Sequence, residues 1–572
     1  MPSHIQNQIA PNGVINPSKV VVVMVPLPWQ GHLHQFISLS HLITARAIPV
    51  HFVGAATENN QGKLRIHGGI NTTNEKMIHF HDFVVPPCIT TPPSPTSAHN
   101  FPIHLIPTFH ATRHLGEPVA ALLRQLSSEF RRVVVVHDFL TSSLVHGIGP
   151  IPNVESYALQ GVSAFAISLL HSRDRDEKSE LDQLDIADLI IPEDVPSMEG
   201  CVPPEIMELS FRECTFVKLS SGNLYNTSMA IERPYVNLMA RILPNKKHWA
   251  IGPLNMVTLS EKKVSNGRHM CLEWLDKQAP RSVIYVSFGT TTTFTDEQIG
   301  ELALGLEQSG QKFIWVLRDA EKATRKVELP KGFEERAKDV GIVMRDLAPQ
   351  LEILGHPSTG GFLSHCGWNS CIESIAMGVP IGAWPMHSDQ PRNTSLITQV
   401  LKVGTAVRDW SRRFELATAS TIADGVRKLM ASTEGNAMRK KAAELGAALR
   451  DSLAEGGDSH KEFDSFGGKK KRKPANRQRT HVHVAALRWI QGDVGFSGKA
   501  RSVIVREEQG QETLDPAQLS GLTGALGCVS EYMRLTRTRA MMRFGAQRIV
   551  RIANGPSVEE MRGGKCLVRI YF

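Results

Sequence analysis

The 572-residue sequence predicts an α/β protein with two doubly wound domains, followed by an atypical basic tail. Continuous apolar runs, which are typical of buried parallel strands, recur in both halves of the chain. Stretches with apolar residues at helical spacing separate these runs. At about 100–200 residues per domain, a chain of this length holds more than one domain. The tail lacks long periodic segments, so we expect it to be disordered.

The first α/β series begins at Val20–Val25, a continuous apolar run that predicts a buried strand. The loop Pro26–His32 interrupts this run, and apolar residues at helical spacing follow the loop. Val50–Val53 and Val133–Val136 are further runs of the kind expected in a parallel sheet. The first half of the chain therefore predicts one doubly wound domain.

A second α/β series begins with Ser282–Phe288, which predicts a strand. Thr295 and Gln298 form a capping-box pattern at the start of the next helix, and Gly310 is expected just beyond its end. Three later runs predict further strands, with helical segments between them: Phe313–Leu317, Gly360–Ser364 and Val379–Trp384. The second half therefore predicts another doubly wound domain.

A change in composition indicates the boundary between the two domains. Serine, lysine, asparagine and glycine accumulate in Ser260–Gly267, which indicates a linker. We expect a disordered N-terminus (1–18), a first Rossmann-like domain (19–252), a linker (253–275), a second Rossmann-like domain (276–454), a C-terminal helix packed back on the first domain (455–466) and the basic tail (467–572).

The net charge of +8 belongs to the tail. Residues 467–572 carry 20 lysines and arginines against 8 aspartates and glutamates, so the rest of the chain is close to neutral. The main body therefore gives no reason to expect binding to nucleic acid or to a membrane. Eight scattered cysteines without a CxxC pair fit a reduced compartment better than a disulfide framework or a zinc site.

The N-terminus lacks the basic start and apolar stretch of a secretory signal. No run approaches the ~20 apolar residues that a membrane span needs. We therefore expect a soluble cytoplasmic protein.

The segment Leu347–Gln390 is the most informative part of the chain, because its pattern predicts a strand, a glycine-containing turn and a helix. A helix that starts near Asn369 would direct its free N–H groups and positive dipole end at the turn. His365, Asn369 and Ser370 add hydrogen-bond donors there. Such a place suits a diphosphate.

Glu373 follows one turn into that helix, where a carboxylate can accept hydrogen bonds from ribose hydroxyls. The same pattern is open to a structural interpretation. Gly367 then makes an ordinary strand-to-helix turn, and Trp368 is a core residue. The predicted strand, turn and helix are compatible with both the diphosphate site and the structural interpretation.

The whole of Leu347–Gln390 resembles the 44-residue signature box of the plant UDP-sugar glycosyltransferases, which have the GT-B fold of two facing Rossmann-like domains. Leu347, Gly367 and Trp368 belong to the donor site that the resemblance implies. Further implied contacts are those of Ala348 and Gln350 with uracil, Glu373 with ribose, His365, Asn369 and Ser370 with the phosphates, and Asp389 and Gln390 with sugar hydroxyls. Ser287 and Thr290 resemble residues of the family's donor-phosphate loop.

Both ends of this box bear on the donor. A glutamine at its end, here Gln390, is the family's usual mark of glucose as the donor sugar. The box usually opens with a tryptophan that stacks on uracil, and here that position is Leu347. Because base–aromatic stacking contributes ~1–3 kcal/mol, its loss is expected to weaken donor binding on the order of ten- to a hundredfold unless a neighbour compensates.

The loop ending in His32 resembles the family's loop after the first strand, where a histidine is the general base. A neutral imidazole can take the proton of an acceptor hydroxyl as its oxygen attacks the sugar. Asp138 matches the family's second catalytic residue, which orients the imidazole. The adjacent His137 is the competing base, but motif register favours Asp138 as the partner of His32 and leaves His137 without a role.

Three segments resemble the zeatin O-glucosyltransferases within this family: Pro26–Gln35, Pro152–Tyr157 and Pro196–Cys201. That subgroup has Asn-Gln where this chain has His34-Gln35, so Gln35 agrees and His34 departs. The resemblance implies an inverting, metal-independent enzyme that moves glucose from UDP-glucose to a hydroxyl of a small molecule, here a cytokinin. It also implies a monomer that needs no cofactor.

The tail extends beyond the expected end of such an enzyme. Lys469–Lys473, with Arg477 and Arg479, could serve as a nuclear-import or nucleic-acid patch. A solvated linker and a gene-model accident are the other interpretations. The alternative function is a non-catalytic small-molecule-binding or nuclear regulatory protein derived from a transferase.

Overall fold

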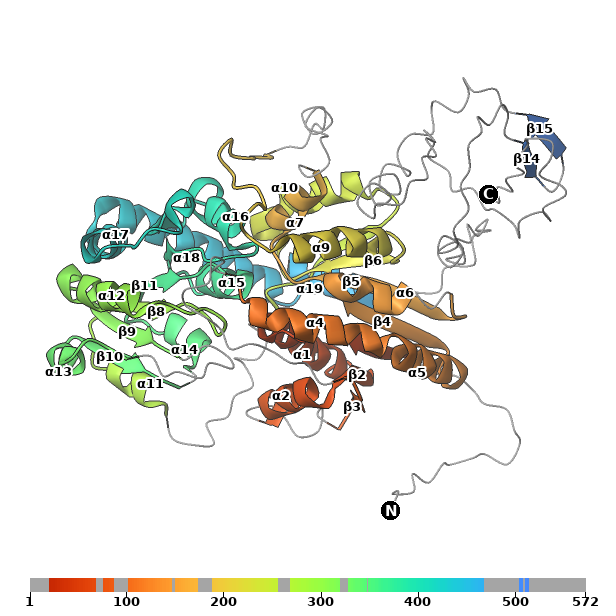
Figure 1. The fold of residues 1–572 in the computed structure, drawn as a ribbon, viewed down its shortest axis with the longest axis horizontal. Helices are drawn as coiled ribbons and strands as arrows, with labels where there is room; N and C mark the ends of the chain where they lie inside the picture. The colour runs from red at the N-terminus through yellow and green to blue at the C-terminus, as the bar shows by residue number, and fades with distance from the viewer. Residues whose placement is uncertain are drawn as a thin grey trace, which may run out of the picture. The chain divides into compact units, whose positions relative to one another are not determined.

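The computed structural model describes residues 20–67, 76–86, 101–146, 150–172, 188–255, 268–318, 328–346, 348–467, 504–507 and 510–513. Leu347, the expected N-terminal segment 1–18 and the basic run 469–473 lie outside them. The chain divides into two units, Met1–Gly468 and Lys469–Phe572. In the first unit, helices cover the faces of two separate parallel sheets (Figure 1), which confirms the predicted α/β class and the GT-B arrangement of two Rossmann-like domains.

The first sheet has the strand order β3-β2-β1-β4-β5-β6-β7, and each pair is parallel. The valine runs of β1 and β4 are buried because helices cover both faces of the sheet. The order reverses between β1 and β4, so the loops after these strands border the crevice where α/β proteins bind ligands. The strands are β1 (Val20–Val25), β2 (Val50–Ala55), β3 (Ile78–Phe83), β4 (Arg132–Asp138), β5 (Val154–Gln160), β6 (Gly222–Tyr225) and β7 (Lys247–Ala250).

The helices of this first domain lie between its strands in the sequence. They are α1 (Gln30–Thr44), α2 (Ala56–His67), α4 (Ile106–Thr112), α5 (Gly116–Glu129), α6 (Ser142–His146), α7 (Ala164–Ser172), α9 (Pro204–Val217) and α10 (Met229–Ile242). The first of these begins directly after the loop that follows β1, so its N-terminal turn lies at the crevice.

The second sheet has the order β10-β9-β8-β11-β12-β13 and is also parallel. Its order reverses between β8 and β11, so Ser287 and Ser364, which end these strands, lie at the second crevice. The strands are β8 (Val283–Ser287), β9 (Lys312–Val316), β10 (Gly341–Met344), β11 (Thr359–Ser364), β12 (Ile381–Ala383) and β13 (Gly404–Ala406). The helices that follow β7 along the chain are α11 (Met270–Leu275), α12 (Asp296–Ser309), α13 (Phe333–Ala337), α14 (Gln350–Leu354), α15 (Trp368–Ala376), α16 (Gln390–Ser395), α17 (Ala419–Ala431), α18 (Thr433–Leu453) and α19 (Asp458–Gly467).

Helix α12 confirms one half of the capping pattern. Thr295 is the N-cap, and its side chain accepts from the backbone N–H of Gln298 at 3.1 Å. Gly310 follows the helix in the left-handed conformation with φ 67°. The reciprocal half of the predicted capping box is wrong, because the Gln298 side chain donates instead to the carbonyl of Ala417 at 2.9 Å.

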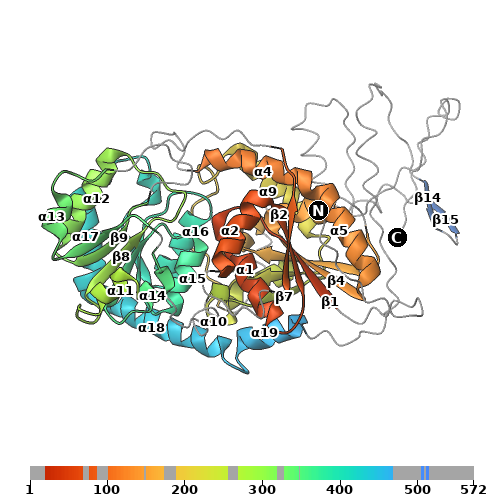
Figure 2. The same cartoon turned by 90° about the horizontal axis from the view of Figure 1, so that it is seen from below.

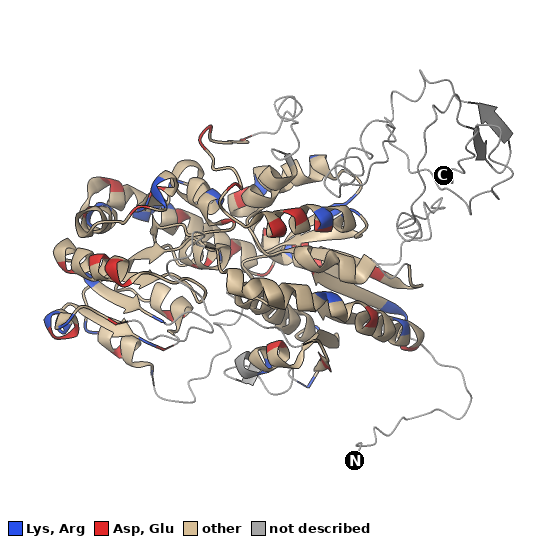
Figure 3. Ribbon diagram, viewed as in Figure 1, with Lys and Arg blue, Asp and Glu red and all other residues tan. Residues whose placement is uncertain are grey.

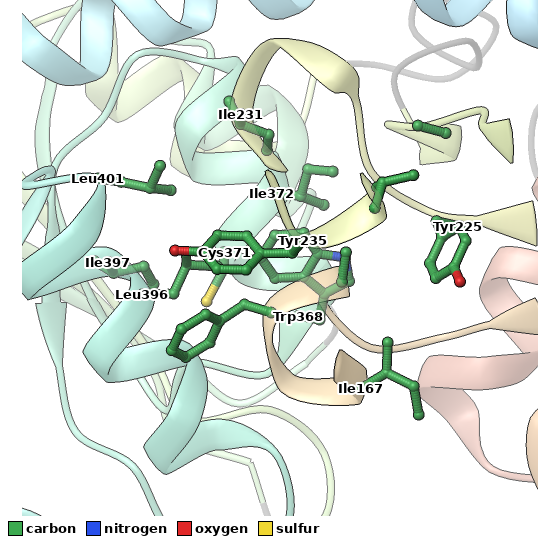
Figure 4. Close-up of a cluster of buried hydrophobic side chains, with 14 of the residues drawn as sticks. Ile167, Tyr225, Ile231, Tyr235, Trp368, Cys371, Ile372, Leu396, Ile397 and Leu401 are labelled. Carbon is green, nitrogen blue, oxygen red and sulfur yellow. The ribbon is translucent and has the colours of Figure 1, made fainter. Parts of the chain in front are cut away.

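One buried apolar cluster joins the two domains (Figure 4). It combines Ile231 and Tyr235 of α10 in the first domain with Trp368 and Ile372 of α15 in the second. Fully burying a large apolar side chain contributes about 1.5–3 kcal/mol. The cluster therefore holds the domains together beside the crevices.

The chain returns from the second domain to the first through α18 and α19, which Figure 2 shows along one side of both domains. Phe463 and Phe466 of α19 are buried in the core of the first domain. The Phe466 ring centroid lies 5.1 Å from that of Tyr157 and 5.6 Å from that of Trp249. These aromatic contacts anchor the last helix of the unit on the first sheet.

The unit Lys469–Phe572 is described only at two strands. These are β14 (Ile504–Glu507) and β15 (Gly510–Thr513), which pair in antiparallel fashion with Ile504 opposite Thr513. In the first unit, acidic and basic residues are interspersed over the ribbon (Figure 3). None of the described helices is long and apolar enough to cross a bilayer.

Candidate active site

A cavity of about 920 Å³ lies between the two domains of the first unit. Residues that follow β1, β4 and β5 line one side, and residues that follow β8 and β11 line the other. Every predicted site residue within the described ranges lines it: His32, Asp138, Ser287, Thr290, Ala348, Gln350, His365, Gly367, Trp368, Asn369, Ser370, Glu373, Asp389 and Gln390. Leu347 lies outside those ranges.

His32 and Asp138 form a hydrogen-bonded pair at the crevice of the first sheet. His32 lies in the first turn of α1, and Asp138 ends β4. Nδ1 of His32 is 2.6 Å from Oδ2 of Asp138, and Oδ1 of Asp138 accepts from the backbone N–H of Leu140 at 2.9 Å. Because a carboxylate only accepts, the neutral imidazole carries its proton on Nδ1 and keeps the lone pair on Nε2.

The surroundings of His32 set its proton affinity and its position. Burial lowers the pKa of His32, but the charge of Asp138, its hydrogen bond and the charge of Asp389 outweigh burial and raise that pKa above its ordinary value. Gly161, after β5, lies against the ring, because a Cβ there would be 3.2 Å from Nδ1 of His32. The imidazole is thus held between a carboxylate and a close backbone.

His137 is excluded as the competing base by its position. Its Nδ1 lies 2.9 Å from the carbonyl oxygen of Asp138, and its Nε2 lies 3.1 Å from Oγ of Ser220. Burial lowers the pKa of His137 to about 4. The ring is fully buried and does not line the cavity, so its role is structural.

The N-terminus of α15 forms part of the second wall. Gly367 is the N-cap and offers no capping side chain, so the first N–H groups of the helix have no intrahelical partner. The side-chain amide of Asn369 donates to the carbonyl of Gly31 at 2.8 Å. Trp368 is 3% exposed, and its Nε1 donates to the carbonyl of Asn226 at 2.7 Å. The end of the helix is therefore suited to an anion, and Trp368 is also a core residue.

Glu373 lies deeper along the same helix and is hydrogen-bonded at both carboxylate oxygens. Asn255 donates to Oε1 at 2.5 Å, and Gln350 donates to Oε2 at 2.7 Å. Burial raises the pKa of Glu373, while these two hydrogen bonds oppose the increase. Nε2 of Gln350 is also 3.1 Å from Oγ of Ser370, so the start of α14 contacts the first turn of α15.

Asp389 and Gln390 lie where α16 begins. Oε1 of Gln390 accepts from the backbone N–H groups of Met386 at 2.8 Å and His387 at 3.0 Å, so Nε2 is the end left for a ligand. Oδ2 of Asp389 accepts from Asn393 at 2.7 Å. Burial raises the pKa of Asp389, against the opposing effects of Asn393 and of the charge of His32. The pair offers one amide donor beside one carboxylate acceptor.

Two histidines that line the cavity from the second domain are neutral at physiological pH. Burial lowers the pKa of His365 to about 4 and that of His387 to about 3. They supply polar contacts without charge. Among the described residues, no group of three or more His, Cys, Asp or Glu side chains is arranged to hold a metal ion.

Comparison with known proteins gives the family. A model described as "Glycosyltransferase, N-terminal domain" matches residues 18–256, and one described as "UDP-glucoronosyl and UDP-glucosyl transferase" matches residues 224–440. The chain is 51% identical over 456 residues to the zeatin O-glucosyltransferase of Phaseolus lunatus, and the match covers 78% of this chain and 96% of that protein. The chain belongs to the UDP-glycosyltransferase family.

Other UDP-glycosyltransferases match over a similar length. The zeatin O-xylosyltransferase of Phaseolus vulgaris is 49% identical, with 78% of this chain and 97% of that protein covered. Phytolacca americana UGT2, solved with UDP-2-fluoro-glucose and pterostilbene, superposes with a TM-score of 0.62 at 26% identity, covering 79% of this chain and 99% of that one. A Siraitia grosvenorii transferase solved with UDP superposes with a TM-score of 0.60 at 28% identity, covering 78% and 99%.

This chain is thus a UDP-glycosyltransferase that acts on small molecules.

For some of the residues that line the cavity, the sequence alone predicts no role. Asn255 donates to Glu373 from within the expected linker, and nothing in its sequence neighbourhood indicated this contact. The sequence indicates no role for Gln35, although its position one turn after His32 places it at the site.

Proposed function

We propose that this UDP-glycosyltransferase is an inverting O-glucosyltransferase that moves glucose from UDP-glucose to a hydroxyl of a cytokinin of the zeatin type. The observation that supports this most is that the His32–Asp138 pair lines the same cavity as the N-terminus of α15 in the second domain. A carboxylate holds Nδ1 of His32 and leaves the lone pair of Nε2 for a proton, as general-base catalysis requires. This arrangement favours an enzyme over the non-catalytic alternative.

In the proposed mechanism, Nε2 of His32 takes the proton of the acceptor hydroxyl. The oxygen bonds to C1 of the sugar from the side opposite the diphosphate while the C1–O bond to UDP breaks, so an α-linked donor gives a β-glucoside. Asp138 holds the imidazole through Nδ1 and stabilises its protonated form. The proton remains on His32 until it passes to solvent.

The donor is proposed to lie along α14 and α15. Ala348 and Gln350 would contact uracil, Glu373 the ribose, and His365, Asn369 and Ser370 the diphosphate, together with Ser287 and Thr290 of the β8 loop. The N–H groups at the start of α15 stabilise the negative charge that grows on departing UDP. We propose that the reaction needs no metal and no further cofactor.

Glucose as the donor sugar is proposed on Gln390 and Asp389. The free amide nitrogen of Gln390 and the carboxylate of Asp389 provide one donor and one acceptor for sugar hydroxyls. The two relatives at 51% and 49% identity are named for glucose and for xylose transfer, respectively. Their names support a pentose and a hexose as the pair of donors to compare.

The test is a matrix of two donors and several acceptors. Purified protein is incubated with UDP-glucose or UDP-xylose and with trans-zeatin, cis-zeatin or a flavonol, and products are identified by mass spectrometry. We expect zeatin O-glucoside and UDP to form fastest, with kcat/KM for UDP-glucose at least about tenfold above that for UDP-xylose, equivalent to ~1.4 kcal/mol. A preference for UDP-xylose would refute glucose, and turnover of the flavonol alone would refute the cytokinin acceptor.

A further inference from the structure

Gln35 connects α1, which carries His32, to α15, whose N-terminus lies at the proposed donor site. It lies one turn after His32 on α1 and is 2% exposed. Its Nε2 donates to the carbonyl of Gly161 at 2.8 Å and to Oδ1 of Asn369 at 2.8 Å. Gly161 is the residue packed against the His32 ring, and Asn369 lies in the first turn of α15. One amide group therefore contacts both halves of the site.

Backbone groups fix the direction of every hydrogen bond in this network. The carbonyl of Gly161 only accepts, so Gln35 must present its NH2 group there. The second N–H of that group then requires the oxygen of Asn369, which places Nδ2 of Asn369 against the carbonyl of Gly31. Asn226 also donates to Oδ1 of Asn369, at 3.4 Å, while its own oxygen accepts from a backbone N–H. Only one orientation of the Asn369 amide satisfies these partners.

This orientation decides what Asn369 offers to the cavity. Its oxygen already accepts two hydrogen bonds, and one of its two N–H bonds is used by Gly31. The remaining N–H is the group left for an anion. A flipped amide would instead present an oxygen lone pair, which repels phosphate.

We propose that Gln35 is a positioning residue for the donor, which locks the Asn369 amide so that an N–H and not an oxygen faces the diphosphate. The inference rests on the proposed function, in which Asn369 contacts the phosphates of UDP-glucose. Gln35 itself touches neither the diphosphate nor the acceptor oxygen in this role. A glutamine suits the task because it has two donors on one nitrogen, whereas a glutamate of the same shape has none.

A double-mutant cycle tests the proposal. The full chain is prepared as wild type, Gln35→Met, Asn369→Ala and the double variant, and UDP binding is measured by calorimetry. Methionine keeps the length of glutamine without its donors, so we expect UDP affinity to fall about tenfold in Gln35→Met. Because Gln35 acts through Asn369, the double variant should bind UDP no more weakly than Asn369→Ala alone. Losses that multiply, or an unchanged affinity in Gln35→Met, would overturn the proposal.

A matched control separates this effect from a general loss of packing. Gln298 is also buried and hydrogen-bonded, but it does not line the cavity. Gln298→Met should lower the melting temperature and leave UDP affinity unchanged. If Gln35→Met does not fold, Gln35→Ala replaces it in the cycle. A wild-type chain that binds UDP but transfers no sugar would refute the proposed function while the cycle still decides on Gln35, and a wild type that does not bind UDP would refute both.

Discussion

The pKa of His32 decides the pH range in which its imidazole can accept a proton. Burial lowers this pKa, and the carboxylates of Asp138 and Asp389 raise it further than burial lowers it. Only the deprotonated ring is a base, so activity should grow as the pH rises through this raised pKa. The two carboxylates therefore shift the rising limb of the pH profile to higher pH.

Asp138→Asn removes both the charge and the carboxylate hydrogen bond that raise the pKa of His32. Of the effects that remain, burial lowers that pKa more than the charge of Asp389 raises it, so the rising limb of kcat/KM against pH should move to lower pH. The maximal rate should fall by about 10²–10⁴, because the tautomer with a free Nε2 is no longer enforced. A pH–rate profile of both proteins measures this, and a limb that stays in place would contradict the coupling.

Leu347 is the one position of the signature box that departs from the family at a proposed ligand contact. Leu347→Trp restores a ring that can stack on uracil, and base–aromatic stacking contributes ~1–3 kcal/mol. We expect UDP to bind on the order of ten- to a hundredfold more tightly, by calorimetry, with kcat little changed. An unchanged affinity would mean that a neighbouring side chain already compensates.

Residue types at the site were easier to predict than the atoms they present. The sequence predicted both Asn369 and Gln390 at the donor site, and both line the cavity. Which end of the Asn369 amide faces the ligand depends on the carbonyl of Gly31, which is distant in the sequence, and the Gln390 amide is fixed by the backbone N–H groups of Met386 and His387 just before α16. A sequence pattern carries no information on such contacts, and Asn255 escaped prediction for the same reason.

At the scale of single elements, the loop after β8 depends on a glycine. Gly289 has φ 79°, and a Cβ there would lie 3.0 Å from Nε2 of His365. Gly289→Ala is therefore strained, at a cost of about 1–2 kcal/mol, and it pushes against a ring proposed to contact phosphate. We expect UDP affinity to fall about tenfold, as measured by calorimetry.

Gly300 provides the control for this substitution. It lies within α12, and a Cβ added there would meet no neighbouring atom within 4 Å. Gly300→Ala should therefore stabilise the helix by roughly 0.5–1 kcal/mol without changing UDP affinity. Equal losses of affinity in both variants would contradict a local role for Gly289.

Strand periodicity explains why Asp138 and not His137 pairs with His32. Successive side chains of a strand point to opposite faces, so only one of two neighbours at the end of β4 can face the cavity. Continuous apolar runs predicted the strands well, because parallel strands are buried on both faces. They could not show that Gln298 caps a distant loop instead of its own helix.

At the scale of the whole molecule, all described cavity residues and the helix α19 belong to the unit Met1–Gly468. A chain ending at Gly468 should therefore keep its melting temperature and its kcat/KM within about twofold. Thermal unfolding and a UDP-release assay on both chains measure this. A truncated chain that fails to fold or loses its turnover would show that residues 469–572 contribute to the enzyme.

The arrangement of two doubly wound domains followed from the alternation of apolar runs and helical segments, and the structure confirms it. The interface between the domains could not be predicted from the sequence, because it depends on contacts of residues such as Tyr235 and Trp368, which are far apart in the sequence. Apolar residues at helical spacing indicate that a face is buried, but not what covers it. The cavity forms where the two domains meet, so its shape also depends on this interface.

In the proposed mechanism, a base on one domain acts on a UDP-sugar held by the other. The most direct test compares His32→Ala with wild type by UDP-glucose binding and by single-turnover transfer to zeatin. Because His32 acts in chemistry, we expect the dissociation constant of UDP-glucose to stay within about threefold while the transfer rate falls at least about 10²-fold. Unchanged transfer in His32→Ala would contradict this mechanism, since transfer would then proceed without the proposed base.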